Sequence, residues 1–349
     1  MIKRGFEIAL LCLLLCAPAA PTLAKVNICF IPKLTGSAAG EAACRAAQAF
    51  AEENGFTLTP ESVEKPTAAA QVSAVRDAVN NGADGICIDV ADAAGVDAAL
   101  KDAVAGGLVV TTFGADALTD ARGITVSQGT PEELGRMLAD LLAASLTERG
   151  RDAAKDEIRY CWHCGLEKNE TEAAWRAAGE VYIAERYPNW INVAPDGYYC
   201  KLDSRKAAAA GEAILAAHPD IDGIICSDPV ALEGQARALQ NLGLGAQQVT
   251  ITGFGTPNAL KPYLAEGILS CFGLWDVRQQ AVLACYLTHA LIFGADIAPG
   301  DVITVPGMGT FDVQPDSALD EKADDARGVV VLLPEQPVLT AENIDNYDF

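Results

Sequence analysis

Two cysteines three residues apart, Cys161 and Cys164, enclose a tryptophan and a histidine, and these residue types allow three kinds of chemistry. In an oxidising compartment the thiols can form a disulfide, with each other or with Cys200 or Cys226. A Cys-x-x-Cys pair between a strand and a helix can instead be redox-active, because that setting lowers the pKa of a thiol. Thiolates together with His163 also suit a soft metal ion. We favour the disulfide and keep the redox and metal sites as alternatives.

Carboxylates at the ends of predicted strands, or in the loops that follow them, form a second group of candidates. Their oxygens can accept hydrogen bonds from the hydroxyls of a small ligand. Most carboxylates in such positions cap helices instead, by accepting hydrogen bonds from backbone N–H groups. We select Asp116, Asp228 and Glu172 as binding residues ahead of Asp89.

Enzyme signatures are absent from the sequence, which has no Gly-x-x-x-x-Gly-Lys-Ser phosphate loop, no His-Glu-x-x-His motif and no Gly-x-Ser-x-Gly elbow. Besides His163 the chain has two histidines, His218 before a proline at a helix end and His289 within an apolar helix. Neither position suggests a catalytic base. We therefore predict that the protein is not an enzyme and that it needs no cofactor.

The elements that must position these residues alternate along the chain, with short β-rich runs followed by longer amphipathic runs. This alternation is typical of parallel sheets covered by helices on both faces, and it occurs twice. In the first set the predicted strands are 26–31, 57–60, 85–89, 108–112 and 124–127, and the predicted helices are 38–54, 68–80, 95–105 and 131–149. In the second set the predicted strands are 158–162, 191–199, 223–226, 249–252 and 268–272, and the predicted helices are 172–186, 204–217, 230–242 and 258–265.

The predicted fold is therefore α/β, with two doubly wound parallel-sheet lobes joined by a hinge of several strands. The remaining elements, a helix at 277–293 and strands at 302–305 and 328–333, are too few for a third lobe and must return to the first two. In such sheets ligands bind at the carboxyl ends of the strands. The predicted lobes are 25–128 plus 277–302, and 129–276 plus 303–349.

Residues 1–24 have the pattern of a secretory signal peptide. Two basic residues precede an apolar run at 8–16, which is too short to span a bilayer. Small residues before Ala24 suit cleavage after that position, so we expect export to the periplasm. A lipoprotein acylated at Cys12 or Cys16 is the alternative, although leucine precedes each of these cysteines where a small residue is usual.

Composition excludes several classes of partner. The chain has 47 acidic and 25 basic residues and a net charge of −22, so it repels nucleic acid and anionic lipid. After residue 24 there is no run of apolar residues long enough to span a membrane, and we do not expect an integral membrane protein. The cysteines that remain after residue 24 are odd in number, so at least one thiol is predicted to stay free or to pair outside the chain.

Six blocks of residues, in order along the chain, match one known group of binding proteins. The blocks are Ile31-Pro32-Lys33-Leu34-Thr35-Gly36, Ser127-Gln128-Gly129-Thr130-Pro131, Gly253-Phe254-Gly255-Thr256-Pro257-Asn258, Phe272-Gly273-Leu274-Trp275-Asp276, Val331-Leu332-Leu333-Pro334-Glu335, and Glu342-Asn343-Ile344-Asp345-Asn346-Tyr347-Asp348-Phe349. The chain resembles the Lsr-type autoinducer-2-binding proteins of bacterial ABC importers from about residue 26 to residue 349. It resembles less closely the rhamnose-binding proteins of the same type I periplasmic family.

The resemblance implies ligand contacts for Lys33 and Asp276. Lys33 matches the lysine that meets the ligand from the first lobe, and Asp276 matches the aspartate of the Leu-Trp-Asp block. At that position a carboxylate can accept hydrogen bonds from two hydroxyls while Trp275 packs on a sugar face, or it can cap the following helix. Phe113 and Trp162 are the aromatic residues that we expect in the cleft, although aromatic residues after strands are more often packing residues.

This sequence departs from the ligand-contacting residues of the family at several positions. Gly114 stands where the family has the first aspartate of a Trp-Asp-Ser-Asp stretch, whereas Asp116 matches the second aspartate. Thr171 and Glu172 stand where the family has an adjacent aspartate and glutamine. The binding residues at these places are therefore predicted to differ in charge and length from those of the family.

A further departure surrounds Asp228, since Ser227 and Pro229 stand where the family has a proline and an alanine. A buried polar group without its partner costs about 1–3 kcal/mol, so these exchanges should change what is bound. The predicted ligand-binding residues are Lys33, Phe113, Asp116, Thr171, Glu172, Ser227, Asp228, Pro229, Trp275 and Asp276.

From the resemblance we expect an exported solute-binding protein that closes two lobes around a small polyhydroxylated ligand of the autoinducer-2 type. Its expected partner is the permease of an ABC transporter, and we expect a monomer. A rhamnose- or pentose-type sugar is the alternative ligand, and a membrane receptor that senses closure is the alternative partner. An alternative from another class is a thiol-redox or metal-binding protein that uses Cys161, His163 and Cys164.

Overall fold

The computed structural model describes residues 5–6, 25–320, 328–334 and 336–348, and the chain divides into two compact units. The first unit comprises Met1–Gln128 and Asp276–Pro334, and the second comprises Gly129–Trp275 and Glu335–Phe349. The predicted signal peptide lies outside the described residues except for the short strand β1 (Gly5–Phe6). Within the described ranges no helix is long and apolar enough to cross a membrane.

The first unit is built on one sheet with the order β1-β12-β13-β14-β6-β5-β4-β2-β3. Neighbouring strands are parallel except where β13 pairs with β12 and with β14. The strands are β2 (Asn27–Ile31), β3 (Thr57–Pro60), β4 (Gly85–Ile88), β5 (Val109–Phe113), β6 (Ile124–Ser127), β12 (Val302–Val305), β13 (Gly309–Pro315) and β14 (Val329–Leu332). Every residue of β4 and β6 is buried, and β4 (Gly-Ile-Cys-Ile) is apolar along its whole length rather than alternating, as expected for a strand covered on both faces.

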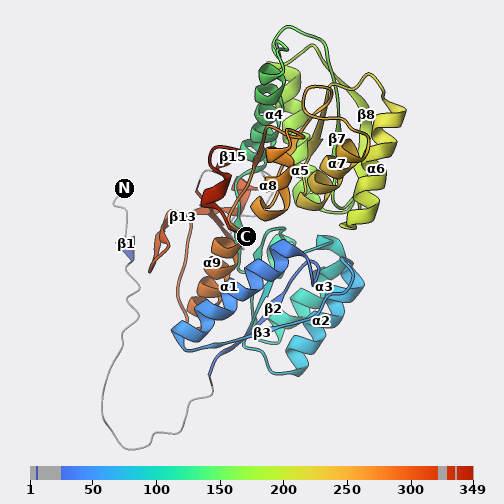
Figure 1. Cartoon of the computed structure of the whole chain (residues 1–349). Coiled ribbons are helices and arrows are strands. Elements are labelled where there is room, and N and C mark those ends of the chain that lie inside the picture. The colour runs from blue at the N-terminus through green and yellow to red at the C-terminus, as the bar shows by residue number, and fades with distance from the viewer. Residues whose placement is uncertain (1–4, 7–24, 321–327, 335, 349) are drawn as a thin grey trace, which may run out of the picture. The chain divides into compact units, whose positions relative to one another are not determined.

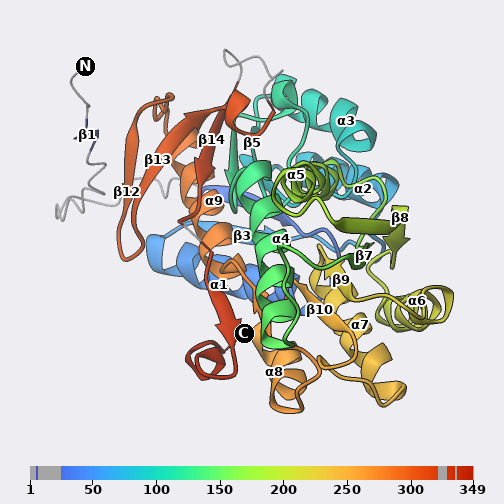
Figure 2. The same ribbon diagram turned by 90° about the horizontal axis from the view of Figure 1, so that it is seen from above.

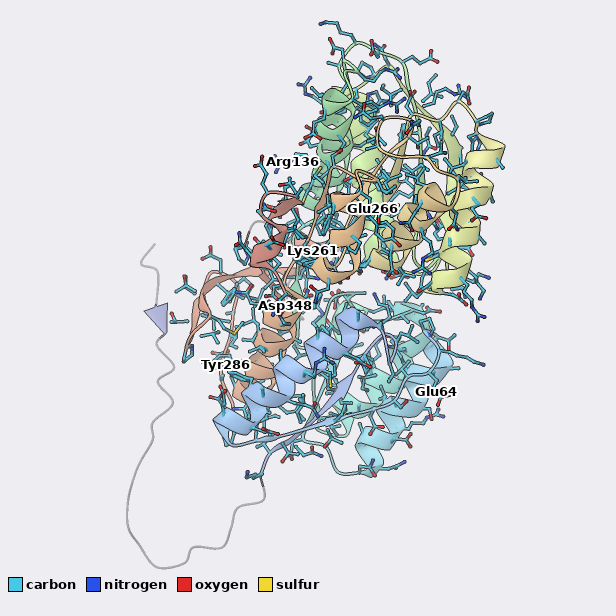
Figure 3. All side chains as sticks on the ribbon, in the orientation of Figure 1. Glu64, Arg136, Lys261, Glu266, Tyr286 and Asp348 are labelled. Atoms are coloured by element: carbon cyan, nitrogen blue, oxygen red, sulfur yellow. The ribbon has the colours of Figure 1, made fainter. Side chains whose placement is uncertain are left out.

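Helices cover both faces of this sheet, with α1 packed on α9 and α2 packed on α3 (Figure 1). Tyr286 of α9 meets Phe50 of α1 edge to face, and Figure 3 labels its side chain. Asp92 caps α3, since its Oδ1 accepts a hydrogen bond from Gly95 N at 3.0 Å. The helices are α1 (Ala38–Asn54), α2 (Ala68–Asn80), α3 (Ala93–Ala105) and α9 (Val277–Ile292), with short 3₁₀ turns η1 (Thr119–Ala121) and η2 (Asp316–Ala318).

The second unit has a four-stranded parallel sheet with the order β10-β9-β7-β8 and a separate antiparallel pair, β11 with β15. Helix α4 packs on α5, and α6 packs on α7 (Figure 2). The strands are β7 (Ile158–Cys164), β8 (Trp190–Tyr199), β9 (Gly223–Cys226), β10 (Thr250–Gly253), β11 (Cys271–Gly273) and β15 (Val338–Thr340). The helices are α4 (Pro131–Glu148), α5 (Glu170–Arg186), α6 (Ser204–Ala217), α7 (Pro229–Asn241) and α8 (Pro257–Ala265), followed by η3 (Ile344–Asn346).

The C-terminal segment belongs to the second unit. Leu339 and Ile344 are buried in the core of that unit. Asn258 Nδ2 on α8 donates a hydrogen bond to Asp348 Oδ1 at 3.1 Å, and Lys261 on the same helix pairs with Asp345. Figure 3 labels Lys261 and Asp348.

The predicted α/β fold class with two parallel-sheet units is confirmed. The prediction that 303–334 belong to the second lobe is wrong, because β14 pairs in parallel with β6 and so extends the first sheet. Without β14, that edge of β6 would expose unpaired backbone N–H and C=O groups. Asp276 also falls in the first unit rather than the second.

Candidate functional site

In the first unit, candidate side chains gather where parallel strands end. Lys33 follows β2 and Asp89 follows the neighbouring strand β4, so both emerge at the same edge of the sheet. Lys33 Nζ lies 3.2 Å from Asp89 Oδ1, and the two side chains are 18% and 23% exposed. Burial raises the pKa of the Asp89 carboxyl, and the Lys33 ammonium opposes that rise. This half-buried ion pair offers a donor and an acceptor to a polar ligand.

Asp116 follows β5, as predicted, but its carboxylate is already held by protein groups. Arg122 donates to both oxygens, with Nε 2.9 Å from Oδ1 and Nη2 2.6 Å from Oδ2. Thr112 Oγ1 donates to Oδ1 at 2.5 Å. Arg122 Nη1 also donates to Asp316 Oδ1 at 2.7 Å, and the arginine side chain is only 2% exposed. Asp116 therefore anchors Arg122 between β5 and η2, and its contact with a ligand stays a prediction.

Asp276 lies at the start of α9 and takes the capping role that the sequence left open. Its Oδ1 accepts hydrogen bonds from Arg278 N at 2.9 Å and from Gln279 N at 3.4 Å. The Arg278 guanidinium also donates to both oxygens, at 3.0 and 2.9 Å. A ligand hydroxyl would have to share these oxygens, so the binding role of Asp276 stays a prediction.

In the second unit, Glu172 is the centre of a buried network at the end of β7. Its Oε2 accepts hydrogen bonds from Gly165 N at 3.1 Å and from Ser227 Oγ at 3.0 Å. Its Oε1 accepts a hydrogen bond from Asn169 Nδ2 at 3.1 Å, and Asn169 caps α5. Thr171 precedes Glu172 in the first turn of α5 and is half-buried. The structure thus brings together Glu172 and Ser227, which lie 55 positions apart in the sequence.

Asp228 and Pro229 begin α7, next to the Glu172 network. Asp228 Oδ1 accepts hydrogen bonds from Val230 N at 2.7 Å and from Ala231 N at 3.2 Å, so this carboxylate is a helix cap. Pro229 is in the first turn, where its missing N–H costs nothing.

Gly165 brings Asp228 and Glu172 close together. A Cβ atom on Gly165 would lie 2.9 Å from Asp228 Cγ and 3.0 Å from Glu172 Oε1. Both carboxylates therefore border a spot that only a glycine leaves open. Sequence reasoning did not select Gly165, although it directly follows the Cys-x-x-Cys run.

The predicted aromatic contacts lie in packed surroundings. Trp275 is 9% exposed and meets Phe254 and Trp175 edge to face, with ring centroids 5.0 and 5.8 Å away. Phe113 is 5% exposed and stacks on Phe30 at 5.1 Å. The prediction that Trp162 lines a cleft is wrong, since it is fully buried and its Nε1 donates to Glu180 at 2.6 Å. The ligand contacts of Trp275 and Phe113 stay predictions.

The predicted local disulfide is also wrong. All nine cysteines within the described ranges are free, and eight of them are buried. Cys161 and Cys164 lie in one strand, β7, and side chains three residues apart in a strand point to opposite faces. They therefore cannot reach the short Cβ–Cβ distance that a disulfide needs. Cys161 packs instead in the core with Cys200 and Cys226.

Redox and metal chemistry find little support at this strand. Burial raises the pKa of Cys161 and of Cys164 to about 12, whereas a reactive thiol needs a lowered pKa. His163 is fully buried, and its Nδ1 lies 3.2 Å from Gln235 Oε1. Among the residues that the structure describes, no group of three or more His, Cys, Asp and Glu side chains could hold a metal ion.

Comparison with known proteins decides the family. The family described as periplasmic binding protein domain matches residues 28–296. The chain belongs to this periplasmic binding protein family. Its members are solute-binding proteins rather than enzymes, so the predicted family and the predicted lack of catalysis are confirmed.

Two solved structures of this type are similar over most of the chain. LsrB from Clostridium saccharobutylicum, in complex with AI-2, is 48% identical, with a TM-score of 0.90 over 93% of this chain and 100% of that one. A solute-binding protein of an ABC transporter from Clostridium phytofermentas, with bound L-rhamnose, is 22% identical, with a TM-score of 0.82 over 93% of this chain and 98% of that one. The second likeness shows the fold alone, whereas the first shows an LsrB-like solute-binding protein.

Proposed function

We propose that this solute-binding protein is exported and binds autoinducer-2, or a closely similar small polyhydroxylated molecule, for import by an ABC transporter. The observation that carries the proposal is the 48% identity to an LsrB protein in complex with AI-2, over 93% of the chain. The pattern of residues 1–24 supports export to the periplasm, and the family supports a permease as the partner.

The chemistry at the strand ends agrees with such a ligand. The Lys33–Asp89 pair in the first unit combines a donor with an acceptor, and the Glu172–Ser227 network with Asp228 in the second unit is rich in acceptors. A neutral ligand with several hydroxyls can use both kinds of group without bringing a charge that must be compensated. We propose that residues of both units contact the ligand and that the units close as it binds.

Calorimetric titration of the purified protein with autoinducer-2, L-rhamnose and D-ribose tests the proposal. We expect binding of autoinducer-2 and a higher Tm in its presence, because a ligand at 100 times its Kd stabilises the folded state by about 2.7 kcal/mol. Lys33→Met should weaken binding, whereas Lys65→Met, the same exchange at an exposed position of the first unit, should not. Binding of L-rhamnose or D-ribose alone would instead support the sugar alternative.

A further inference from the structure

We propose that Asp89 is the positioning residue for Lys33. We also propose that position 114 carries a glycine because a side chain there would displace the Asp89 carboxylate. This inference rests on the proposed function only in taking Lys33 as a ligand contact. It adds two residues, Asp89 and Gly114, that together decide where the ammonium of Lys33 lies.

The backbone around Asp89 is fixed relative to the backbone around Lys33. Strands β2 and β4 are parallel neighbours, and Asp89 N donates a hydrogen bond to Ile31 O at 3.0 Å. Gln71 is fully buried on α2, and its Nε2 donates to Asp89 O at 2.7 Å and to Pro32 O at 3.3 Å. One amide group thus holds both segments, so the ion pair has rigid supports on each side.

The Asp89 carboxylate is aimed by the turn after β5. Ala115 N donates a hydrogen bond to Asp89 Oδ1 at 3.0 Å, the same oxygen that faces Lys33 Nζ at 3.2 Å. Gly114 has φ +69°, a conformation that suits glycine. A Cβ atom there would lie 2.8 Å from Asp89 Oδ1 and 2.9 Å from Asp89 Cγ, too close for both to keep their places. A residue with a side chain at position 114 would therefore force the Asp89 carboxylate to move from its present place.

Positioning matters because lysine is long and flexible. Its rotamer freedom is lost when the ammonium is fixed on a ligand. A carboxylate that already holds the ammonium removes part of that cost from binding, as preorganisation does generally. The pair also neutralises a charge in a half-buried place, which suits an uncharged ligand.

A double-mutant cycle on affinity for autoinducer-2 tests this role. We expect Asp89→Asn to weaken binding about tenfold when Lys33 is present and much less in the Lys33→Met background, since the two residues act as a unit. Asp89→Glu should restore part of the loss. Equal losses in both backgrounds, or no loss at all, would overturn the inference, because a purely structural role does not depend on Lys33.

Gly114→Ala provides a second variant with a matched control. It should weaken binding as Asp89→Asn does, whereas Gly82→Ala, at φ +70° with nothing within 4 Å of the added Cβ atom, should leave affinity unchanged. Equal effects of the two alanines would show that backbone strain alone is responsible and would contradict the inference.

A measurement without ligand separates this inference from the proposed function. Acetylation of lysines, followed by mass spectrometry, compares Lys33 with the exposed Lys25 in the same sample. Asp89→Asn and Gly114→Ala should raise the labelling rate of Lys33 relative to Lys25, and Gly82→Ala should not. If wild-type protein binds no autoinducer-2 but labelling changes as expected, the positioning role stands and the proposed ligand fails. Unchanged labelling would refute the positioning role whatever the ligand is.

Discussion

At the scale of single residues, several carboxylates chosen as ligand contacts already have partners in the protein. Asp116 holds Arg122, while Asp228 and Asp276 cap helices. The sequence marks such positions correctly, since strand ends carry both ligand contacts and helix caps. It does not reveal Arg122, whose second partner Asp316 is 194 positions away.

His163 illustrates how burial changes the pKa of a side chain. Burial lowers its pKa to about 4 in the folded protein, against about 6.5 in the unfolded chain. Below pH 6.5 the unfolded chain therefore binds a proton that the folded protein does not, so folding stability is lost as the pH falls from 6.5 towards 4. The loss from this residue amounts to about 3 kcal/mol at the lower end.

His163→Gln should remove that contribution, and the difference in unfolding free energy between the variant and the wild type should change in favour of the variant as the pH falls. Urea denaturation at pH 7.5 and pH 4.5 measures this difference. The pH-dependent contributions of the many carboxylates cancel, because both proteins share them. A difference that does not change with pH would show that His163 is not the group involved.

At the scale of elements, helix caps fix the residue at which each helix begins after the preceding strand. Thr130 and Glu133 form a reciprocal capping box on α4, and Asn169 caps α5. These signals lie within four residues of the helix start, which is why the predicted positions of the helices agree closely with the observed ones. Strand β11 differs, because it pairs antiparallel with β15 instead of joining the parallel sheet.

Asp276 at the start of α9 allows capping to be separated from ligand binding. Asp276→Ala should lower the free energy of unfolding by about 1 kcal/mol, whereas Asp276→Asn should change it little because asparagine caps equally well. If the carboxylate also contacts the ligand, both variants should weaken binding of autoinducer-2. Chemical denaturation of these samples measures the free energy of unfolding, and calorimetric titration of the same samples measures the affinity for autoinducer-2. Wild-type affinity in Asp276→Asn would leave the residue as a cap only.

At the scale of the whole molecule, the chain passes from one unit to the other after Gln128, Trp275 and Pro334. Each unit has a core of its own, and free cysteines are packed as small apolar residues in both of them. Within the described residues no disulfide contributes to the stability of either unit.

Thiol titration of protein purified without reductant tests this picture. After denaturation nine thiols per mature chain should react, because the nine cysteines after residue 24 are free. Under native conditions only Cys44, the one that is half-buried rather than buried, should react at an appreciable rate. Fewer than nine reactive thiols in denaturant would reveal a disulfide and contradict the structure.

By itself the amino-acid sequence determined the two sets of βα units, the helix caps and the likeness to the LsrB-type binding proteins. These depend on local periodicity, on contacts a few residues apart and on ordered motifs. Only the tertiary structure decided that β12 to β14 extend the first sheet, that Arg122 joins Asp116 to Asp316, and that Lys33 pairs with Asp89. Such pairings join residues that are distant in sequence, and they depend on which strand edge and which carboxylate are within reach once the chain has folded.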